Sequence, residues 1–265
     1  MRKLSAVLMA AVFACVAATA HAQDYSWDIQ DDEGNFITQD QLEDQVNTLL
    51  YTFSATAGAG FVNTASLHKV GGLDVRLSFI ATPVPEEFAD VIPTVKDPLE
   101  GADYVAFALL QANLGLPANF EAFARYFTWP TKGEPGGAVT LLGGGLKYGL
   151  LRGGLGTPDI TLIASYQTLL VPEEFNFGSV KTFSGKAFIS KAFTGFTLYG
   201  GGGFDRTELA LTIELPPGFQ TDYNVNSPHG TAGFSFDLIP LLKINLEGNW
   251  GKRSSYALGA ALSFR

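Results

Sequence analysis

Histidine is the residue on which a hydrolytic site in this chain would depend, and only three histidines occur in its 265 residues. His229 follows Ser227 and Pro228 and lies close in sequence to Asp222, so the three residue types of a serine-hydrolase triad occur together. That chemistry also needs a nucleophile held against the histidine and donors for the developing oxyanion. No pattern in the sequence supplies them. We therefore predict that the chain has no catalytic residues and is not an enzyme.

An acidic stretch from Asp28 to Asp40 is the nearest match to a metal-binding motif. If Gly34 takes the sixth position of an EF-hand loop, Ile29 takes the first and Asp40 the twelfth, where calcium prefers a carboxylate and a bidentate glutamate. The sequence contains no zinc-protease motif, phosphate loop, dinucleotide fingerprint or cluster of cysteine and histidine. We predict no metal site and no cofactor.

The elements that would carry any site are β-strands. Apolar and polar residues alternate with period two, which is the pattern of a strand with one apolar and one polar face. The pattern predicts ten strands, within residues 74–79, 104–113, 120–126, 142–150, 160–167, 182–190, 196–203, 232–238, 242–250 and 255–264. Ten is an even number, as single-chain bacterial barrels require, and each strand is long enough to cross a bilayer.

The polar faces of these strands decide which side is the interior. They carry nine charged residues: Asp74, Arg76, Glu121, Arg125, Lys147, Lys186, Asp237, Lys243 and Glu247. The core of a soluble β-sandwich, the alternative fold, would hold these charges only at a heavy desolvation cost. In a membrane barrel they line the lumen, where Glu121 and Arg125 can pair with Lys147, and the apolar faces meet lipid. Trp250, Tyr256 and Phe264 lie near strand ends, where an aromatic girdle is expected.

The N-terminus predicts export. Arg2 and Lys3 precede an uncharged apolar run, and Ala20-His21-Ala22 is a cleavage site, so residues 1–22 are predicted to be a signal peptide. The 17 basic and 26 acidic residues become 15 and 26 without Arg2 and Lys3, a net charge of −11 that argues against binding nucleic acid. The remaining chain has no cysteine. These features predict location in a bacterial outer membrane.

Connections between the predicted strands alternate between short and long, as in outer-membrane barrels. The short ones are residues 114–119, 152–158, 194–195 and 239–240, and the long ones are 82–101, 128–137, 171–177 and 207–228; the turn at 251–254 is the exception. Short connections are expected to face the periplasm. The long, external ones carry acidic residues: Glu86, Glu87, Asp90, Asp97, Glu173, Glu174, Glu208, Glu214 and Asp222.

Residues 23–71 precede the first strand. Thr38 can cap a helix with Gln41 as its reciprocal partner, and Leu42, Val46 and Leu49 follow at helical spacing, which predicts a helix over 39–50. A segment rich in small residues follows the helix. We expect residues 23–71 to lie in the periplasm or to plug the barrel.

Several segments resemble an uncharacterised family of outer-membrane barrels, a domain-of-unknown-function family. They are Gly60-Phe-Val-Asn-Thr-Ala-Ser-Leu, Gly71-Gly-Leu-Asp-Val, Leu141-Leu-Gly-Gly-Gly-Leu-Lys-Tyr-Gly, Ser190-Lys-Ala-Phe, Tyr199-Gly-Gly-Gly-Gly-Phe and Ala257-Leu-Gly-Ala-Ala-Leu-Ser-Phe-Arg. The segment Phe61–Leu67 is also similar to the Asn-Pro-Ala segment of the long-chain fatty-acid transporter group, in which an N-terminal hatch fills the barrel; Thr64 replaces the proline.

Together these features predict an all-β, antiparallel, up-and-down transmembrane β-barrel of about ten strands with a short N-terminal helix. Twelve strands are the alternative, if residues 51–71 supply two more. The expected parts are the signal peptide (1–22), a periplasmic or plug segment (23–71) and the barrel (72–265). The expected function is to bind or pass a small apolar ligand. The alternative is a closed structural or surface-interaction barrel, because the interior of so small a barrel is nearly filled by side chains. Expected partners are outer-membrane lipid and a small hydrophobic ligand, and we expect a monomer.

Overall fold

The computed structural model describes residues 38–84, 103–130, 138–154, 156–171, 178–211, 221–239 and 241–264, and the side chains of residues 129 and 130 are not described. The predicted signal peptide and most of the acidic stretch lie outside these residues. So do seven of the predicted loop carboxylates: Glu86, Glu87, Asp90, Asp97, Glu173, Glu174 and Glu214.

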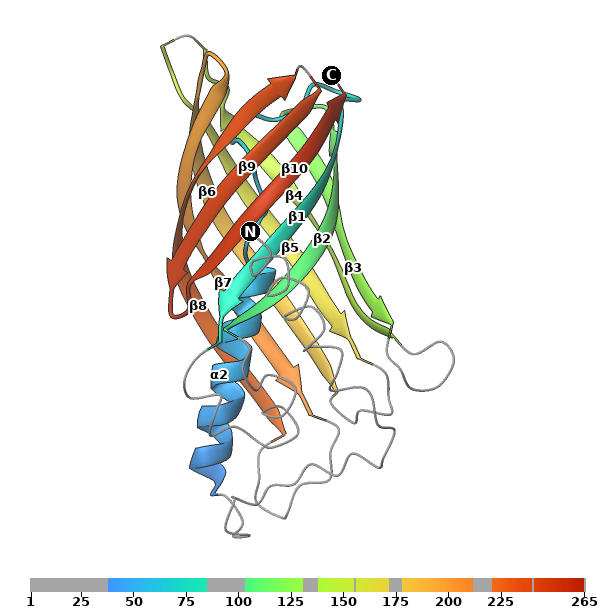
Figure 1. The fold of residues 1–265 in the computed structure, drawn as a ribbon, viewed down its shortest axis with the longest axis vertical. Coiled ribbons are helices and arrows are strands. Elements are labelled where there is room, and N and C mark those ends of the chain that lie inside the picture. The colour runs from blue at the N-terminus through green and yellow to red at the C-terminus, as the bar shows by residue number, and fades with distance from the viewer. Residues whose placement is uncertain are drawn as a thin grey trace, which may run out of the picture.

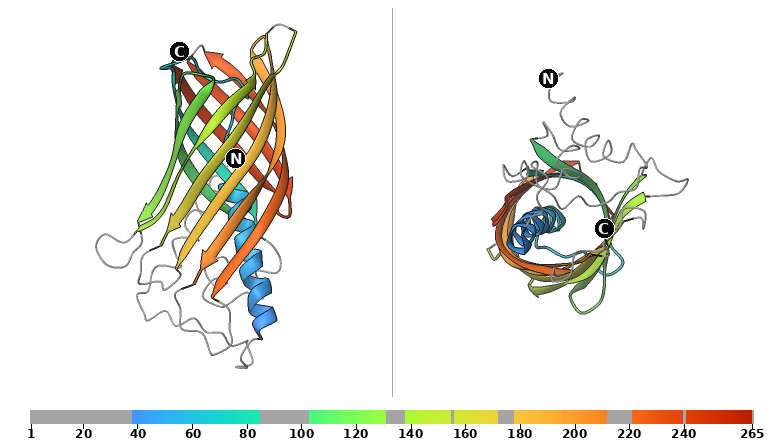
Figure 2. Two further views of the ribbon diagram at one scale, coloured as in Figure 1. Left: turned by 180° about the vertical axis from the view of Figure 1, so that it is seen from behind. Right: turned by 90° about the horizontal axis from the view of Figure 1, so that it is seen from below.

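Ten antiparallel strands form a closed barrel (Figures 1 and 2). They are β1 (Leu73–Pro83), β2 (Tyr104–Gly115), β3 (Phe120–Pro130), β4 (Ala138–Leu151), β5 (Asp159–Leu170), β6 (Ser179–Phe193), β7 (Phe196–Ala210), β8 (Asp222–Ile239), β9 (Leu242–Gly251) and β10 (Ser255–Phe264). Each strand pairs with its neighbours in sequence, and β1 pairs with β10 to close the wall. The predicted ten-stranded barrel is confirmed. The twelve-stranded alternative is wrong, because residues 51–57 are helical and residues 58–72 form no strand.

The barrel has two ends, which differ in their connections. The odd-numbered strands finish at the loop end, where residues 84–103, 131–137, 171–178, 211–221 and 252–254 connect the strands. The even-numbered strands finish at the turn end, together with the C-terminus, and residues 116–119, 152–158, 194–195 and 240–241 connect them. The connection predicted over 207–228 is shorter than expected. β7 and β8 extend into it, so Glu208 and Asp222 lie on strands.

Most of the wall has an apolar outer face and a polar inner face, the reverse of a soluble barrel. In β10, for example, exposed and buried residues alternate without a break. The large apolar side chains exposed on the outer face include Leu77, Phe79, Leu110, Tyr126, Leu142, Leu146, Leu162, Phe183, Ile189, Leu198, Phe204, Leu246, Leu258 and Leu262. The buried polar side chains point inward. In the part of the chain that the structure describes, no helix is long and apolar enough to cross a membrane.

The outward aromatic residues near the strand ends bracket this apolar band. Trp250 and Tyr256 are exposed near the loop end of β9 and β10, and Phe264 is exposed at the turn end. Tyr256 and Phe264 are eight positions apart on β10. That separation corresponds to about 27 Å along a strand and about 20 Å across a bilayer at a tilt of about 40°. The band is therefore close to the height of about 25 Å that lipid-facing walls have.

Helix α2 (Gln39–Ala57) lies at the loop end and enters the barrel (Figure 2). It begins as predicted: the Thr38 hydroxyl accepts from the Gln41 backbone N–H, and the Gln41 side chain accepts from the Thr38 backbone N–H. The helix continues seven residues beyond the predicted end at Leu50 and finishes at Ala57. α2 thus stands at the end of the barrel opposite the short turns and extends into the lumen, as the plug alternative for residues 23–71 expects.

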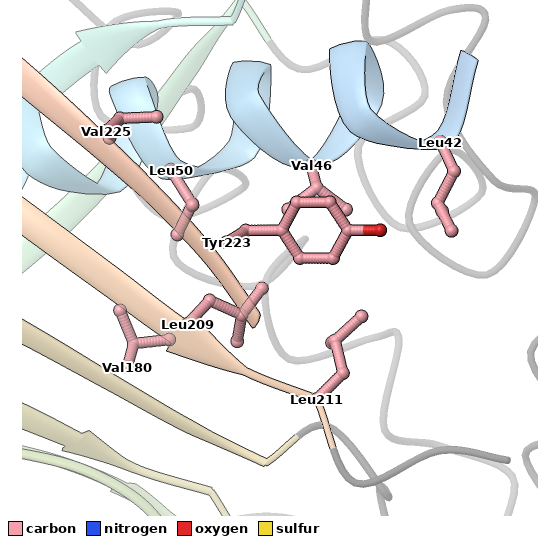
Figure 3. Close-up of a cluster of buried hydrophobic side chains, with 8 residues drawn as sticks. All are labelled: Leu42, Val46, Leu50, Val180, Leu209, Leu211, Tyr223 and Val225. Carbon is pink, nitrogen blue, oxygen red and sulfur yellow. The ribbon is translucent and has the colours of Figure 1, made fainter. Parts of the chain in front are cut away.

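Beyond the apolar band, the two faces of β6, β7 and β8 exchange their character. At the loop end their outward residues are polar: Lys181, Arg206, Glu208, Asn224 and Asn226. Four of their inward residues, Val180, Leu209, Tyr223 and Val225, are apolar and pack with Leu42, Val46 and Leu50 of α2 and with Leu211 in one buried cluster (Figure 3). This part of the wall thus resembles a water-soluble structure, with a polar surface over an apolar core.

The reversal predicts where lipid contact ends. In a variant chain with a single cysteine at an outward position of β7, a membrane-impermeant maleimide should label Arg206→Cys and should not label Leu198→Cys. The two positions share one face of one strand, and the only native cysteine, Cys15, lies in the predicted signal. Labelling is measured by mass after reconstitution into vesicles. Equal labelling of both positions would contradict the boundary.

Candidate functional site

The lumen is occupied by residues 58–72, here called the lumen segment, which connect α2 to β1. The segment runs from the loop end to the turn end, where Gly71 and Gly72 pair with the backbone of Gly115. Its side chains are almost completely buried over Ala59–Val62. Backbone groups so enclosed need hydrogen-bond partners, and the side chains of the wall supply them.

Arg125, on β3, is the first of these partners. Its Nη1 donates to the carbonyl of Ala57 at 2.7 Å, and its Nη2 donates to the carbonyl of Ala59 at 2.7 Å. Gln167 donates to the same Ala57 carbonyl at 3.1 Å and accepts from Arg125 at 3.0 Å. The planar fork of the guanidinium thus spans two alternate carbonyls.

Two further wall cations bind the carbonyls beside these. Lys186 Nζ donates to the Gly58 carbonyl at 2.7 Å, and Arg76 Nη1 donates to the Gly60 carbonyl at 3.2 Å. Both side chains are buried. Four consecutive carbonyls, from residue 57 to residue 60, therefore each accept a hydrogen bond from a buried cation of the wall.

Acidic wall residues bind the N–H groups of the segment. Glu247 Oε1 accepts from the Gly60 N–H at 2.7 Å, while Tyr199 and Asn249 donate to the Glu247 carboxylate. The signs of the wall charges therefore match the backbone: cations meet carbonyls, and a carboxylate meets an N–H. Charge-assisted hydrogen bonds of this kind are the stronger ones.

Uncharged residues continue the contacts toward the turn end. Gln111 donates to the Phe61 carbonyl at 3.2 Å, and Ser235 donates to the Asn63 carbonyl at 3.0 Å. The Ala65 N–H donates to Ser190 Oγ at 2.9 Å. Strands β2, β6 and β8 all take part, so the segment is held from several sides of the wall.

A cluster around Glu121 ends the series. Lys147 Nζ lies 2.8 Å from Glu121 Oε1, as expected for this pair from the sequence, and also donates to Asn113 at 3.0 Å. Glu121 Oε2 accepts from the His68 N–H at 3.0 Å and lies 2.7 Å from His68 Nδ1. Arg125 was expected to join this cluster, but it binds the lumen segment instead.

Small residues let the lumen segment approach the wall. A Cβ on Gly58 would lie 2.2 Å from Asp205 Oδ2 and 2.7 Å from the Ser54 carbonyl oxygen. Gly60 has a φ of +70°, in the left-handed region that favours glycine. The next residue is large. Phe61 has the Arg125 guanidinium 4.1 Å and the Lys186 ammonium 4.7 Å from its ring centroid, a cation–π arrangement.

Asp205 is the buried carboxylate that the sequence analysis missed. It lies on β7, 3.1 Å from Lys186 Nζ and 3.4 Å from His229 Nδ1. The glycines at 200–203 had ended the predicted strand before this position. The alternation nevertheless indicates its direction, because Asp205 is an even number of positions from Thr197 and Tyr199 and so lies on the same inward face of the strand.

The remaining predicted lumen charges take different positions. Asp74 is fully buried and accepts from Ser263 at 2.7 Å and from Asn113 at 2.8 Å. Asp237 is not a lumen residue: its side chain is 45% exposed at the turn end, 3.3 Å from Lys243. A register shift between Asp237 and Ile239 at the end of β8 accompanies this change.

His229 lies on β8 rather than in a loop, and its neighbours do not form a hydrolytic triad. Its Nε2 is 2.9 Å from Lys186 Nζ, and its Nδ1 is 3.2 Å from the backbone carbonyl oxygen of Ser227. A pocket of about 10 Å³ beside Asp205 and His229 has room for about one water molecule. Among the described residues, no group of three or more acidic, histidine or cysteine side chains is placed to hold a metal.

Over residues 90–264, the chain matches a family described as a family of unknown function, DUF6588, which confirms the predicted resemblance to such a family. No curated protein matches the chain. These comparisons do not show the expected similarity to the fatty-acid transporter group.

Several solved structures are similar in fold. The N-terminal β-barrel domain of OprF from Pseudomonas aeruginosa shares 14% identity, with 74% of this chain and 100% of that chain covered and a TM-score of 0.33. The outer-membrane protease OmpT from Escherichia coli shares 14%, with 73% and 95% covered and a TM-score of 0.37. The outer-membrane protein OprG from Pseudomonas aeruginosa shares 13%, with 75% and 98% covered and a TM-score of 0.34. Similarity at these sequence identities and TM-scores gives no information about the activity or the ligand of this chain.

The Arg125 contacts predict a large stability effect. Arg125→Met should lower the free energy of unfolding by at least about 3 kcal/mol, because the Ala59 carbonyl loses its donor, the Ala57 carbonyl keeps only Gln167, and the neighbouring carboxylates lose a cation. Arg152→Met removes an exposed arginine at the turn end and should stay within about 0.5 kcal/mol of the wild type. Urea unfolding midpoints in detergent measure both. Equal midpoints would contradict the assigned role of Arg125.

The close approach at Gly58 predicts a second effect. Gly58→Ala should destabilise the barrel by about 1–3 kcal/mol, because the new methyl group overlaps Asp205 and the Ser54 carbonyl. Gly156→Ala is the matched control, since a Cβ there meets nothing within 4 Å. The same unfolding measurement applies. A Gly58→Ala variant as stable as the control would show that the segment does not lie this close to the wall.

Proposed function

We propose that this chain, which belongs to the DUF6588 family of unknown function, is an outer-membrane β-barrel closed by its own lumen segment, with a structural or surface-interaction role. The apolar outer face supports membrane insertion: an exposed apolar surface that surrounds the whole wall would aggregate in water, whereas lipid covers it. Lipid is then the partner of the wall, and the chain needs no second copy to cover this face.

The observation that carries the closed state is the series of wall contacts along the lumen segment. Carbonyls or N–H groups from Ala57 to His68 are bound by side chains of β1, β2, β3, β6, β8 and β9. A continuous passage would require many of these bonds to break together. Each would leave a buried charge or a buried backbone group without a partner, which costs free energy.

The location of the exposed surface supports a role outside the barrel. Barrels of this class place their longer connections on the outside of the cell, so the loop end, with α2 and the extended β6–β8, faces outward in this proposal. The predicted signal peptide fits the same location. Interactions with other molecules would then take place on α2 and on the surface around it.

Binding or passage of a small apolar ligand is the second candidate. The apolar cluster between α2 and β6–β8 favours it, because it is an apolar surface at the mouth of a polar lumen. A ligand would have to displace α2 to reach this surface, and the apolar side chains farther into the lumen are buried against the lumen segment. The closed barrel therefore accounts for more of the described contacts.

Single-channel conductance of the full-length protein in a planar bilayer tests the closed state. The closed barrel should give no steady conductance, and folding is checked by heat-modifiable gel mobility. A steady conductance from the folded full-length chain would contradict the proposal.

A variant without residues 23–71 tests what closes the lumen. If it folds and conducts while the full-length chain is silent, the lumen segment is the closure, as proposed; if it folds and remains silent, side chains of the wall alone fill the lumen. Uptake of an apolar dye by the folded full-length chain would instead favour the second candidate. We expect reduced stability, because deletion leaves Arg125, Lys186 and Glu247 without their backbone partners.

A further inference from the structure

We propose that Lys181 and Arg206, on the outer face of β6 and β7 at the loop end, form a binding site for the phosphate of an anionic lipid headgroup. The proposal rests on the membrane location argued above, but it does not depend on whether the lumen is closed. It concerns a face of the wall that takes no part in holding the lumen segment.

The site lies at the edge of the apolar band. Phe183 and Phe204 are the last large apolar residues that face outward on β6 and β7 toward the loop end, and Lys181 and Arg206 are the next outward residues. Phe183 is the cross-strand partner of Arg206. Basic side chains next to the apolar boundary extend to the headgroup layer while their aliphatic stems remain on the apolar surface.

The register brings the two cations together. On the outer face, Lys181 is paired with Glu208 and Arg206 is paired with Phe183, so Lys181 and Arg206 are diagonal neighbours. Such neighbours are about 7–8 Å apart in an antiparallel sheet, within the joint reach of two long side chains. Asn226 is the partner of Arg206 on β8 and adds an exposed amide on the same face.

Both cations have donors available. Lys181 is exposed and makes no hydrogen bond or ion pair with another described residue. The Arg206 side chain is 52% exposed, and its Nε lies 2.8 Å from Glu208 Oε1. This ion pair orients the guanidinium and leaves its two terminal nitrogens, which can bind a phosphate through a bidentate fork. The lumen cations, in contrast, are buried and already engaged.

Adjacency to the apolar band favours a lipid over a free ion. A lipid phosphate at this boundary keeps its acyl chains on Phe183 and Phe204, so that one molecule contacts both parts of the surface. A free phosphate gains only the two exposed charges, which salt screens. Lipid is also held at high local concentration beside the site.

The test uses the full-length protein in phosphatidylcholine vesicles with increasing fractions of phosphatidylglycerol. The thermal unfolding midpoint, read by gel mobility, rises as a ligand binds the folded state. In pure phosphatidylcholine, Lys181→Gln/Arg206→Gln should unfold like the wild type, which shows that membrane insertion is intact. With phosphatidylglycerol, its apparent affinity for the anionic lipid should be roughly tenfold weaker than that of the wild type.

Two controls make the result specific. Lys69→Gln removes one exposed charge at the turn end and should retain the wild-type response, and Lys181→Arg should retain it because the charge remains. The proposal is overturned if the double variant responds like the wild type, or if Lys69→Gln loses as much. It is also overturned if inorganic phosphate added to phosphatidylcholine vesicles reproduces the stabilisation, since a free anion would then suffice.

Discussion

The structure depends on one constraint: in an enclosed lumen, every charge and every backbone polar group needs a partner. The wall supplies buried cations and carboxylates, and the lumen segment supplies carbonyls and N–H groups that have no partner within a helix or a sheet. Each set satisfies the other, with Arg125 across the Ala57 and Ala59 carbonyls as the clearest case. The small residues around Gly58 follow from the same constraint, because larger side chains would hold the backbone too far from these donors.

A second feature follows from the change of solvent along the strands. Over the apolar band, lipid requires an apolar outer face and the lumen accepts a polar inner face. Beyond Phe183 and Phe204 the surroundings of β6–β8 change, and the faces exchange their character so that α2 packs on an apolar inner surface. The helix and the lumen segment are thus anchored by two different interactions: apolar packing at the mouth and charge-assisted hydrogen bonds below it.

The wall could be predicted from the sequence because period-two alternation is local. It gave the ten strands, the inward direction of Arg125 and Lys186 and the outward direction of Phe264; the Thr38 cap was equally local. The partners of the lumen charges could not be predicted. A backbone carbonyl is the same in every residue, so nothing in residues 57–60 marks them as the acceptors for Arg125 and Lys186.

Two further differences have local causes. The loop ends of β7 and β8 were interpreted as a connection, and there the pattern of polar residues inside and apolar residues outside fails because the faces exchange, as at Glu208 and Asn224. Asp205 was hidden by the glycines that precede it, since glycine carries no sign of which face it is on. The alternation along β8 assigns Asp237 to the inward face, but this residue lies at an irregular strand end, where the alternation no longer determines which way a side chain points.

Native-state hydrogen exchange of the lumen segment tests the central claim most directly. The Gly60 and His68 amides donate to buried carboxylates of the wall, and the Ala65 amide donates to Ser190. If the segment is bound throughout the lumen, these three amides should exchange about as slowly as the wall strands, because exchange would require the barrel to open. Exchange as fast as that of an exposed loop, in a barrel whose strands remain protected, would contradict the account.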